Sequence, residues 1–162
     1  MDPAVTKPLD NMQVSDMFCL AAYAATHVIN QRYTPMLRKL GLTYPQYITL
    51  LILQERGPAS VGDIGAALCM TSSTTTPLLK RLEALGFVTR QRDPNDERKV
   101  VVSLTAAGQQ AIAQAPAITD CMVAQTKLSG SDLTQMVGLL RSLTSALTDA
   151  DDTPQLASDV DR

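Results

Sequence analysis

Three cysteines are the residues of this 162-residue sequence that can do covalent chemistry, and they are Cys19, Cys69 and Cys121. They are too few and too scattered for a disulfide scaffold, and no pair has the spacing of metal ligands. A thiolate can attack the O–O bond of a peroxide and become a sulfenic acid. The residues alone leave Cys19 open between a reactive thiol and a small buried hydrophobe, whereas Cys69 is expected in the core.

The single histidine, His27, has no carboxylate and no second histidine at ligand spacing. We interpret it as a residue on a helix face. No metal and no cofactor are therefore expected.

A run of small hydroxyl residues follows a short predicted helix, and a second helix begins on this run. A helix N-terminus that carries Ser and Thr offers hydroxyls and free backbone N–H groups to phosphates and base edges. Lys80, further along the second helix, is expected on backbone phosphates. The residues expected to face a major groove are Ser72, Ser73, Thr74 and Thr75.

A basic hairpin follows this helix. Its predicted strands, Phe87–Arg90 and Val100–Leu104, flank a polar turn over residues 92–98. An arginine of such a hairpin can enter a neighbouring minor groove, and we expect Arg98 to do so while Asp96 orients it. The alternative is that the hydroxyls merely cap a helix and that the arginines are solvated. The further basic residues expected at DNA are Arg90 and Arg92.

The net charge of −2 argues weakly against a nucleic-acid binder, but the charges are unevenly distributed. From Lys80 to Lys99, six basic residues stand against four acidic ones, whereas from Ser129 to Arg162 six aspartates stand against two arginines. A local basic face is what phosphates require. The distribution is therefore compatible with DNA binding.

The elements that position these residues are predicted to form a winged helix-turn-helix over residues 41–104. Ser60 with Asp63 predicts the start of its first short helix. In the second helix, apolar residues recur at intervals of three and four, and Gly86 suits its C-terminal end. A further helix, Tyr44–Glu55, precedes this pair and begins at a predicted capping box of Thr43 and Gln46.

Longer helical regions flank this part. Residues 12–40 are predicted to be helical, with a kink or a restart of the helix near Pro35. Residues 105–147 are predicted to hold one long helix kinked at Pro116 and a second helix capped by Ser129 with Asp132. A helix whose apolar face has no partner in its own chain usually packs against a second copy. Both flanking regions are therefore predicted to be dimerisation helices.

The two ends of the chain hold prolines and charges. We expect residues 1–11 to be a flexible arm and residues 148–162 to be an acidic mobile tail. No apolar span of about 18 residues is present, and the N-terminus lacks the apolar segment of a signal peptide. We therefore expect no membrane partner and a cytoplasmic location.

Three motifs resemble the multiple antibiotic resistance regulator (MarR) family, and the resemblance runs from about Met12 to about Leu147. It implies a mainly α fold with a small β wing, a winged helix-turn-helix, and a homodimer joined through its N- and C-terminal helices. A symmetric dimer predicts a pseudo-palindromic double-stranded DNA operator with half-sites about one helical turn apart. The motifs are Leu78–Glu83 through Gly86, Asp93–Arg98, and Val102–Gly108.

Within that family, the spacing of Cys19, Tyr33 and Tyr44 resembles the organic hydroperoxide resistance regulators. The resemblance implies that organic hydroperoxides oxidise Cys19 and that both tyrosines hydrogen-bond to it. Fourteen residues of continuous helix span about 21 Å at 1.5 Å per residue, so Tyr33 of the same chain cannot touch Cys19 unless the helix folds back. The resemblance implies that the other subunit supplies this contact, and the arithmetic agrees.

A second thiol is needed to complete the oxidation chemistry. In some of these regulators, a cysteine in the helix after the wing resolves the sulfenic acid as an intersubunit disulfide. The resemblance gives this role to Cys121. A small cellular thiol that forms a mixed disulfide with Cys19 is the alternative.

The predicted function is a redox-sensing repressor and not an enzyme. The reduced dimer binds its operator, and oxidation of Cys19 breaks the tyrosine hydrogen bonds and releases the DNA. Three alternatives remain open. They are a repressor released by a lipophilic or phenolic ligand with Cys19 inert, a thiol peroxidase, and a winged helix that binds proteins instead of DNA.

Overall fold

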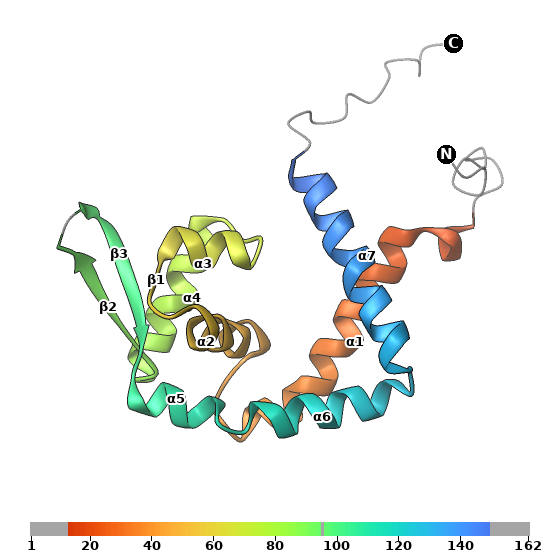
Figure 1. The fold of residues 1–162 in the computed structure, drawn as a ribbon, viewed down its shortest axis with the longest axis horizontal. Coiled ribbons are helices and arrows are strands. Elements are labelled where there is room, and N and C mark those ends of the chain that lie inside the picture. Colours follow the sequence, from red (N-terminus) through yellow and green to blue (C-terminus); the bar gives the residue numbers. More distant parts are fainter. Residues whose placement is uncertain (1–12, 95, 150–162) are drawn as a thin grey trace, which may run out of the picture. The chain divides into compact units, whose positions relative to one another are not determined.

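The computed structural model describes residues 13–94 and 96–149, without the side chain of Glu97 (Figure 1). The chain forms two compact units, Met1–Met122 and Val123–Arg162. The expected flexible arm and nearly all of the expected acidic tail lie outside the described residues.

The first unit begins with a one-turn 3-10 helix, Val14–Asp16, and the long helix α1, Phe18–Arg38. The helix does not restart at Pro35, because α1 runs through this proline. A proline inside a helix removes one N–H donor and usually kinks or breaks the helix. Pro35 is exposed, so its ring faces solvent and not the core. Leu37 is fully buried and anchors the end of α1 in the core.

Helix α2, Tyr44–Arg56, contributes more residues to the core than any other described element. The predicted capping box is confirmed, because the Thr43 backbone N–H donates to Gln46 Oε1 at 2.8 Å. The core gathers one face of α2 with buried residues from α1, the following helices and the strands. Its members are Leu37, Leu42, Tyr47, Leu50, Leu53, Ile64, Leu79, Leu82, Val88, Val102, Ile112, Ala115 and Ile118.

Helices α3, Val61–Ala67, and α4, Ser72–Ala84, form the predicted helix-turn-helix. The Ser60 cap is confirmed, because its hydroxyl accepts the backbone N–H of Asp63 at 3.1 Å. The two helices approach closely at Gly65. A Cβ atom at this position would lie 3.0 Å from the Met70 carbonyl oxygen and 3.1 Å from Thr75 Oγ1. Glycine therefore permits the tight crossing that positions α4.

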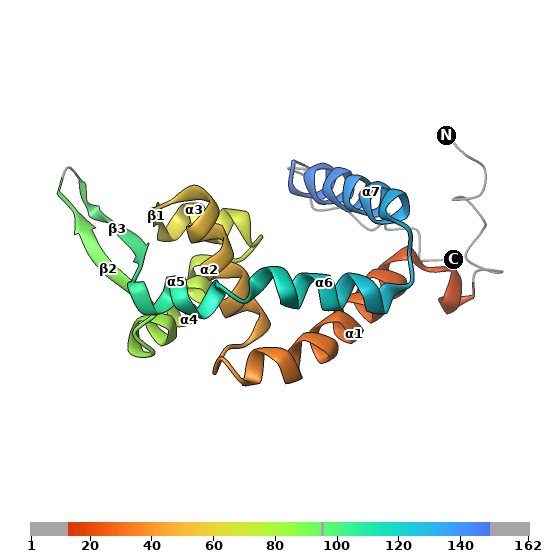
Figure 2. The same cartoon turned by 60° about the horizontal axis from the view of Figure 1, so that its bottom comes forward.

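Three antiparallel strands form the wing in the order β1-β3-β2. Strands β2, Val88–Asp93, and β3, Asp96–Leu104, pair from Val88 with Leu104 to Asp93 with Asp96. Both are longer than predicted, because the polar segment expected to be a turn continues the ladder almost to the tip. The ribbon projects away from the helices α2 to α4 in both views (Figures 1 and 2). The short strand β1, Ala59–Ser60, pairs with β3 and is too short for any alternation to predict it.

Helices α5, Ala106–Ile112, and α6, Ala115–Thr126, replace the single kinked helix predicted after the wing. Pro116 lies in the first turn of α6, where a missing N–H leaves no carbonyl of the helix unpaired. Thr105 caps α5 and ties it to the end of α4. Its hydroxyl accepts the N–H of Gly108 at 3.0 Å and donates to the Gly86 carbonyl at 2.7 Å.

The second unit consists of the end of α6 and helix α7, Gly130–Thr148. The predicted cap is confirmed, because the Ser129 hydroxyl accepts the Asp132 N–H at 3.2 Å. Helix α7 exposes large apolar side chains, of which Leu139 is 65% exposed. Across the described residues, no helix has the length and apolar character that a membrane span requires.

Candidate functional site

The N-terminus of α4 presents a cluster of hydroxyls. Ser72, Ser73 and Thr74 are exposed, and Thr71 Oγ1 lies 2.8 Å from Ser73 Oγ and 3.3 Å from Thr74 Oγ1. Backbone N–H groups in the first turn of a helix have no intrahelical acceptor and attract anions such as phosphate. Lys80, exposed about two turns further along α4, adds a positive charge. This surface therefore offers donors and charge that suit a DNA groove.

Thr75 does not belong to this exposed set, and its predicted contact with a DNA groove was wrong. Its side chain is fully buried, and its hydroxyl donates to the Thr71 carbonyl at 3.0 Å. Five consecutive residues of a helix cover its whole circumference, so at least one member of the hydroxyl run must face the core. That member is Thr75, which lies against Gly65 of α3.

The tip of the wing exposes Arg92, Arg98 and Lys99. Asp96 was expected to orient the Arg98 side chain, but its Oδ1 accepts the backbone N–H of Arg98 at 3.1 Å. The second oxygen of Asp96 pairs with Lys99 Nζ at 3.8 Å. Asp96 therefore shapes the turn of the wing and leaves the Arg98 guanidinium available to a partner.

Arg90 occupies a different place from the other wing arginines. Its Nη1 lies 3.4 Å from Glu83 Oε2 of α4, and its side chain is only 16% exposed. The prediction that it contacts DNA is therefore corrected, since the side chain is directed onto the protein. Arg90 braces β2 against α4, which fixes the wing relative to the hydroxyl cluster.

Cys19 is the second residue of α1, and its side chain is exposed. Its exposed neighbours are apolar: Met17, Phe18 and Leu20, with Phe18 60% exposed. The first turn of α1 also carries backbone N–H groups without intrahelical acceptors. The thiol is accessible, and its surroundings are apolar. Such a site suits a reaction with an organic oxidant better than a reaction with a strongly hydrated oxidant.

Three tyrosines form a cluster where the end of α1 packs on α2. The ring centroids of Tyr33 and Tyr44 lie 4.6 Å apart, and those of Tyr33 and Tyr47 lie 6.1 Å apart. The structure thus brings together the two tyrosines that the sequence singled out. Sequence reasoning missed Tyr47, although its spacing of three from Tyr44 places both on one face of α2.

Burial raises the pKa of all three phenols above the ordinary tyrosine value. Neighbouring phenols raise the pKa of Tyr33 and Tyr44 further. In Tyr47, the nearby Thr119 hydroxyl lowers the pKa by a smaller amount, although the two groups do not reach good hydrogen-bond geometry. All three phenols therefore stay protonated at neutral pH, and the half-buried Tyr33 and Tyr44 can donate hydrogen bonds to an anion.

Cys19 and the tyrosine cluster do not meet within one chain. Cys19 and Tyr33 lie 14 residues apart on one unbroken helix, which corresponds to about 21 Å. Tyr33 can therefore contact Cys19 only if a second copy of the chain supplies that cysteine.

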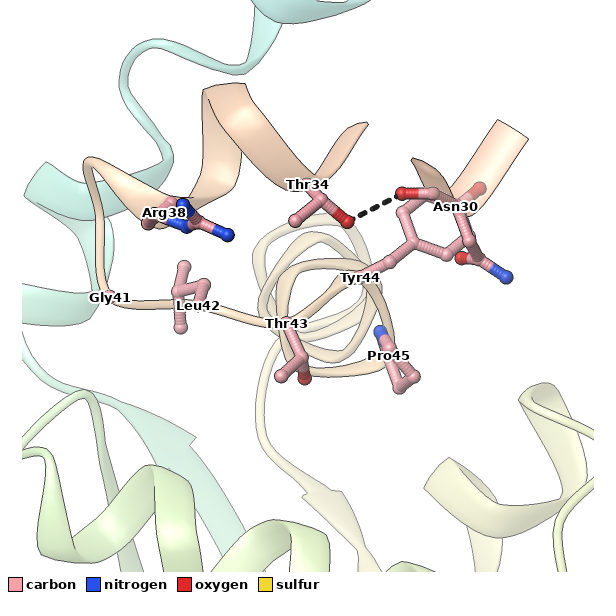
Figure 3. A pocket seen from close by; sticks show the side chains of 8 residues that line it. All are labelled: Asn30, Thr34, Arg38, Gly41, Leu42, Thr43, Tyr44 and Pro45. Carbon is pink, nitrogen blue, oxygen red and sulfur yellow. Dashed lines mark hydrogen bonds between the residues drawn. The ribbon is translucent and has the colours of Figure 1, made fainter. Parts of the chain in front are cut away.

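A pocket of about 460 Å³ lies between α1 and the start of α2, beside the tyrosine cluster (Figure 3). Asn30, Thr34 and Arg38 come from one face of α1, and Tyr44 contributes from α2. Figure 3 shows Arg38 at one end of the pocket and Asn30 with Tyr44 at the other. The remaining lining residues are Gly41, Leu42, Thr43 and Pro45.

The other two cysteines are also exposed. The expectation that Cys69 lies in the core was wrong, because it stands in the turn between α3 and α4 with a φ of 51° and not on the buried face of α3. Cys121 lies on α6. Within the described residues, no three His, Cys, Asp or Glu side chains are grouped to hold a metal ion.

The sequence matches a known protein family and a characterised member of it. The model of the MarR family matches residues 42–100. The organic hydroperoxide resistance transcriptional regulator of Bacillus subtilis is 38% identical over 138 residues, which cover 85% of this chain and 94% of that protein.

Solved structures share the fold. Reduced AbfR of Staphylococcus epidermidis bound to DNA has a TM-score of 0.70 and 31% identity, covering 88% of this chain and all of that one. Overoxidised AbfR bound to DNA has a TM-score of 0.68 and 32% identity, covering 86% and 99%. The winged helix and the nearly complete coverage of the Bacillus regulator together show that this chain is a member of the MarR family.

Proposed function

We propose that this chain is a redox-responsive repressor. A homodimer binds a pseudo-palindromic DNA operator when it is reduced and leaves it when an organic hydroperoxide oxidises Cys19. The observation that carries the proposal is the pairing of Tyr33 with Tyr44, whose rings lie 4.6 Å apart, on a chain that exposes a thiol one helix length away. The similarity to a regulator of organic hydroperoxide resistance and to redox states of AbfR supports it.

DNA binding uses the exposed end of α4 and the tip of the wing. Ser72, Ser73 and Thr74 enter the major groove with the first-turn N–H groups of α4, and Lys80 contacts a phosphate. Arg98 enters the neighbouring minor groove, where the negative potential attracts a guanidinium. Arg92 adds a phosphate contact, and Asp96 and Arg90 hold the wing in shape.

Dimerisation uses the apolar residues that α1 and α7 expose. Phe18 of α1 and Leu139 of α7 are 60% and 65% exposed. Large apolar side chains that are exposed together on one face of a helix usually mark a protein–protein interface. A twofold dimer places Cys19 of one subunit beside Tyr33 and Tyr44 of the other. The two phenol hydroxyls then hydrogen-bond to the sulfur.

The signalling reaction balances without a cofactor. The thiolate of Cys19 attacks the outer oxygen of R–O–O–H, the O–O bond breaks, and the products are Cys–SOH and R–OH after the alkoxide takes up a proton. Sulfur loses two electrons and the peroxide gains them. The new oxygen displaces the tyrosine hydroxyls, so the interface repacks and the two reading heads lose their register on DNA.

Cys121 resolves the sulfenic acid as an intersubunit disulfide. Its thiolate attacks the sulfenic sulfur of Cys19, the S–O bond breaks, and the oxygen leaves as water after protonation. A non-reducing gel tests this step, since oxidised wild type should run as a covalent dimer. Cys121→Ser should run as a monomer, and Cys69→Ser should still cross-link. A mixed disulfide with a small thiol in the wild type would contradict the assignment.

A gel shift on the DNA upstream of its own gene tests the whole proposal. Wild type and Cys19→Ser are compared with and without cumene hydroperoxide. We expect binding to be lost only in the oxidised wild type and to return with dithiothreitol. A loss of about 100-fold in affinity requires only about 2.7 kcal/mol between the two states. Binding that peroxide leaves unchanged would contradict the proposal and favour release by a small molecule.

A further inference from the structure

The hydroxyl of Tyr47 is a buried polar group that the packing of the chain leaves without a partner. Tyr47 is 2% exposed, and its hydroxyl makes no hydrogen bond with any described residue. The other buried side-chain atoms in this situation belong to Asn30 and Arg90, which are both partly exposed residues. A buried donor without an acceptor costs free energy, because it gives up its bonds to water and gains none in the fold. An arrangement that gave the Tyr47 hydroxyl a partner would therefore be stabilised relative to this one.

The nearest acceptor for this hydroxyl is on helix α6. Ala115 and Ile118 of α6 share one core cluster with Tyr47, so the buried face of α6 packs close to Tyr47 on α2. Thr119 follows Ile118 in the chain. Burial raises the pKa of the Tyr47 phenol and the nearby Thr119 hydroxyl offsets part of the rise, but the pair falls short of hydrogen-bond geometry. The two hydroxyls are therefore neighbours that do not bond to each other.

The Thr119 hydroxyl lacks the bond to its own helix that other threonines of the chain make. The hydroxyls of Thr26, Thr34 and Thr134 each donate to the backbone carbonyl four residues earlier. Within the described residues, the Thr119 hydroxyl makes no such bond. Thr119 is also exposed, so its hydroxyl is held neither by α6 nor by the core. It can therefore turn towards Tyr47 when α6 shifts on α2.

Tyr47 and Thr119 each adjoin a residue of the proposed redox reaction. The ring centroids of Tyr47 and Tyr33 lie 6.1 Å apart, and Tyr33 is the proposed partner of the Cys19 sulfur. Thr119 lies two residues before Cys121 on α6. Movement that brings Cys121 to the oxidised sulfur therefore also moves Thr119, whereas repacking of Tyr33 reaches Tyr47 by direct contact.

We propose that Tyr47 and Thr119 are positioning residues of the switch, and that the Tyr47 hydroxyl donates to the Thr119 hydroxyl only after Cys19 is oxidised. This inference rests on the proposed function. The described residues contain no disulfide, so the unbonded hydroxyls belong to the reduced form. The new bond stabilises only the arrangement that has left DNA, and it therefore shifts the equilibrium towards release. Both residues act through the position of α6 on α2, without touching DNA or peroxide.

The operator affinity of the oxidised protein tests this bond. Full-length wild type, Tyr47→Phe, Thr119→Val and the double variant are oxidised with cumene hydroperoxide and titrated onto operator DNA by fluorescence anisotropy. We expect each single variant to bind up to about tenfold more tightly than the oxidised wild type, because the released state loses the same hydrogen bond in both. The double variant should equal the single ones, and Thr119→Ser, which keeps the hydroxyl, should be released like the wild type. Additive effects, or single variants released like the wild type, would overturn the proposal.

The reduced protein separates this role from a merely structural one. Before oxidation, the variants should bind the operator with the affinity of the wild type. Tyr47→Phe should be at least as stable to urea as the wild type at equal protein concentration, because the hydroxyl that it removes makes no bond in this state. If Tyr47→Phe and Thr119→Val both lower the urea midpoint and the double variant lowers it no further, the bond already exists in the reduced protein and the proposal fails.

A spectroscopic signal of the phenol tests the bond without DNA. Carbon-13 at the hydroxyl-bearing carbon gives one nuclear magnetic resonance signal for each of the four tyrosines, and Tyr47→Phe identifies the signal of Tyr47. Oxidation should move that signal in wild type and Thr119→Ser but not in Thr119→Val. A signal that stays in place, or that moves alike in all three, would overturn the proposal. If the signal moves as expected while oxidised wild type stays on its operator, the proposed function fails and the hydrogen bond stands.

Discussion

At the scale of single residues, the proposed switch depends on phenols that keep their protons. The pKa of Tyr33 and that of Tyr44 are raised, first by burial and then by neighbouring phenols. Each hydroxyl therefore stays a donor at neutral pH and can stabilise negative charge on a partner's sulfur. Tyr47, which is 2% exposed, packs its ring against that of Tyr33.

Removing either hydroxyl should slow the oxidation of the thiol. In Tyr33→Phe or Tyr44→Phe, we expect the rate of Cys19 sulfenic acid formation to fall about tenfold, because a hydrogen bond to a charged group contributes about 1.5–3 kcal/mol. Mass spectrometry after a trapping reagent measures the rate. Thr26→Val is the control, since the Thr26 hydroxyl lies on the same helix, is exposed and already donates to the Ala22 carbonyl at 2.9 Å. Equal rates in all variants would remove both tyrosines from the mechanism.

The same phenols should make the fold sensitive to alkali. Their pKa is higher in the folded chain than in the unfolded one, so the folded chain holds these protons more tightly. Below the unfolded pKa of about 10, both states are protonated and stability is complete. Above it, the unfolded chain releases protons first, and the free energy of unfolding falls as pH rises through the folded values. Urea unfolding over this range measures the fall, which should be smaller in Tyr33→Phe.

At the scale of elements, the junction between β3 and α5 explains why the sequence has a Leu-Thr-x-x-Gly motif at Leu104–Gly108. Residues Leu104–Gly108 join β3 to α5, and the Thr105 N–H donates to the Phe87 carbonyl at 3.0 Å. A Cβ atom on Gly108 would lie 2.1 Å from that same carbonyl oxygen. The motif therefore holds the base of the wing against α5, and its glycine is required by backbone that approaches from another element.

Gly108→Ala should destabilise the fold although alanine is the better helix former. We expect the added methyl to cost about 1–3 kcal/mol, because the Phe87 backbone must shift to admit it. Gly62→Ala in α3 is the control, since its Cβ would meet only Ser60 Oγ at an ordinary 3.7 Å. That change should be neutral or stabilise the protein by up to about 1 kcal/mol. Urea midpoints of the two variants compare them, and equal stabilities would refute the junction.

The wing should contribute one charge to DNA binding at its tip. Arg98→Ala should weaken operator binding and reduce the slope of log affinity against log salt by about one, because one fewer counterion is released. Arg90→Ala should leave that slope unchanged, since its side chain is 16% exposed and paired with Glu83. Its effect should appear in thermal stability. Fluorescence anisotropy at several salt concentrations separates the two, and an unchanged slope in Arg98→Ala would contradict the assignment.

Local signals in the sequence predicted most element starts. The caps at Ser60 and Ser129 need only a residue three positions on, so the sequence contains the whole interaction. Thr75 and Arg90 were misassigned because tertiary packing decided them. The Thr75 hydroxyl is buried where α4 packs on α3, and the Arg90 guanidinium pairs with Glu83 of α4. The pocket at Arg38 escaped prediction for the same reason, since its walls come from two helices.

At the scale of the whole molecule, a single chain contains two incomplete halves of a switch. Cys19 lies away from both Tyr33 and Tyr44, because one unbroken helix holds Cys19 and Tyr33 apart. In the proposed mechanism, a twofold dimer completes both sites at once. It also places two reading heads on one side of a duplex, so the chemistry at the sulfur and the spacing of the heads depend on the same interface.

The spacing of the operator should therefore be fixed by the dimer. Half-sites about one helical turn apart place consecutive major grooves on one face, where the two copies of α4 can enter them together. Inserting about five base pairs between the half-sites turns one of them to the opposite face, so affinity should fall to the level of non-specific DNA. An operator of unchanged length with its central bases substituted is the control, and it should keep most of its affinity. Anisotropy titrations compare the three duplexes, and tight binding to the lengthened operator would mean that each chain reads its half-site independently.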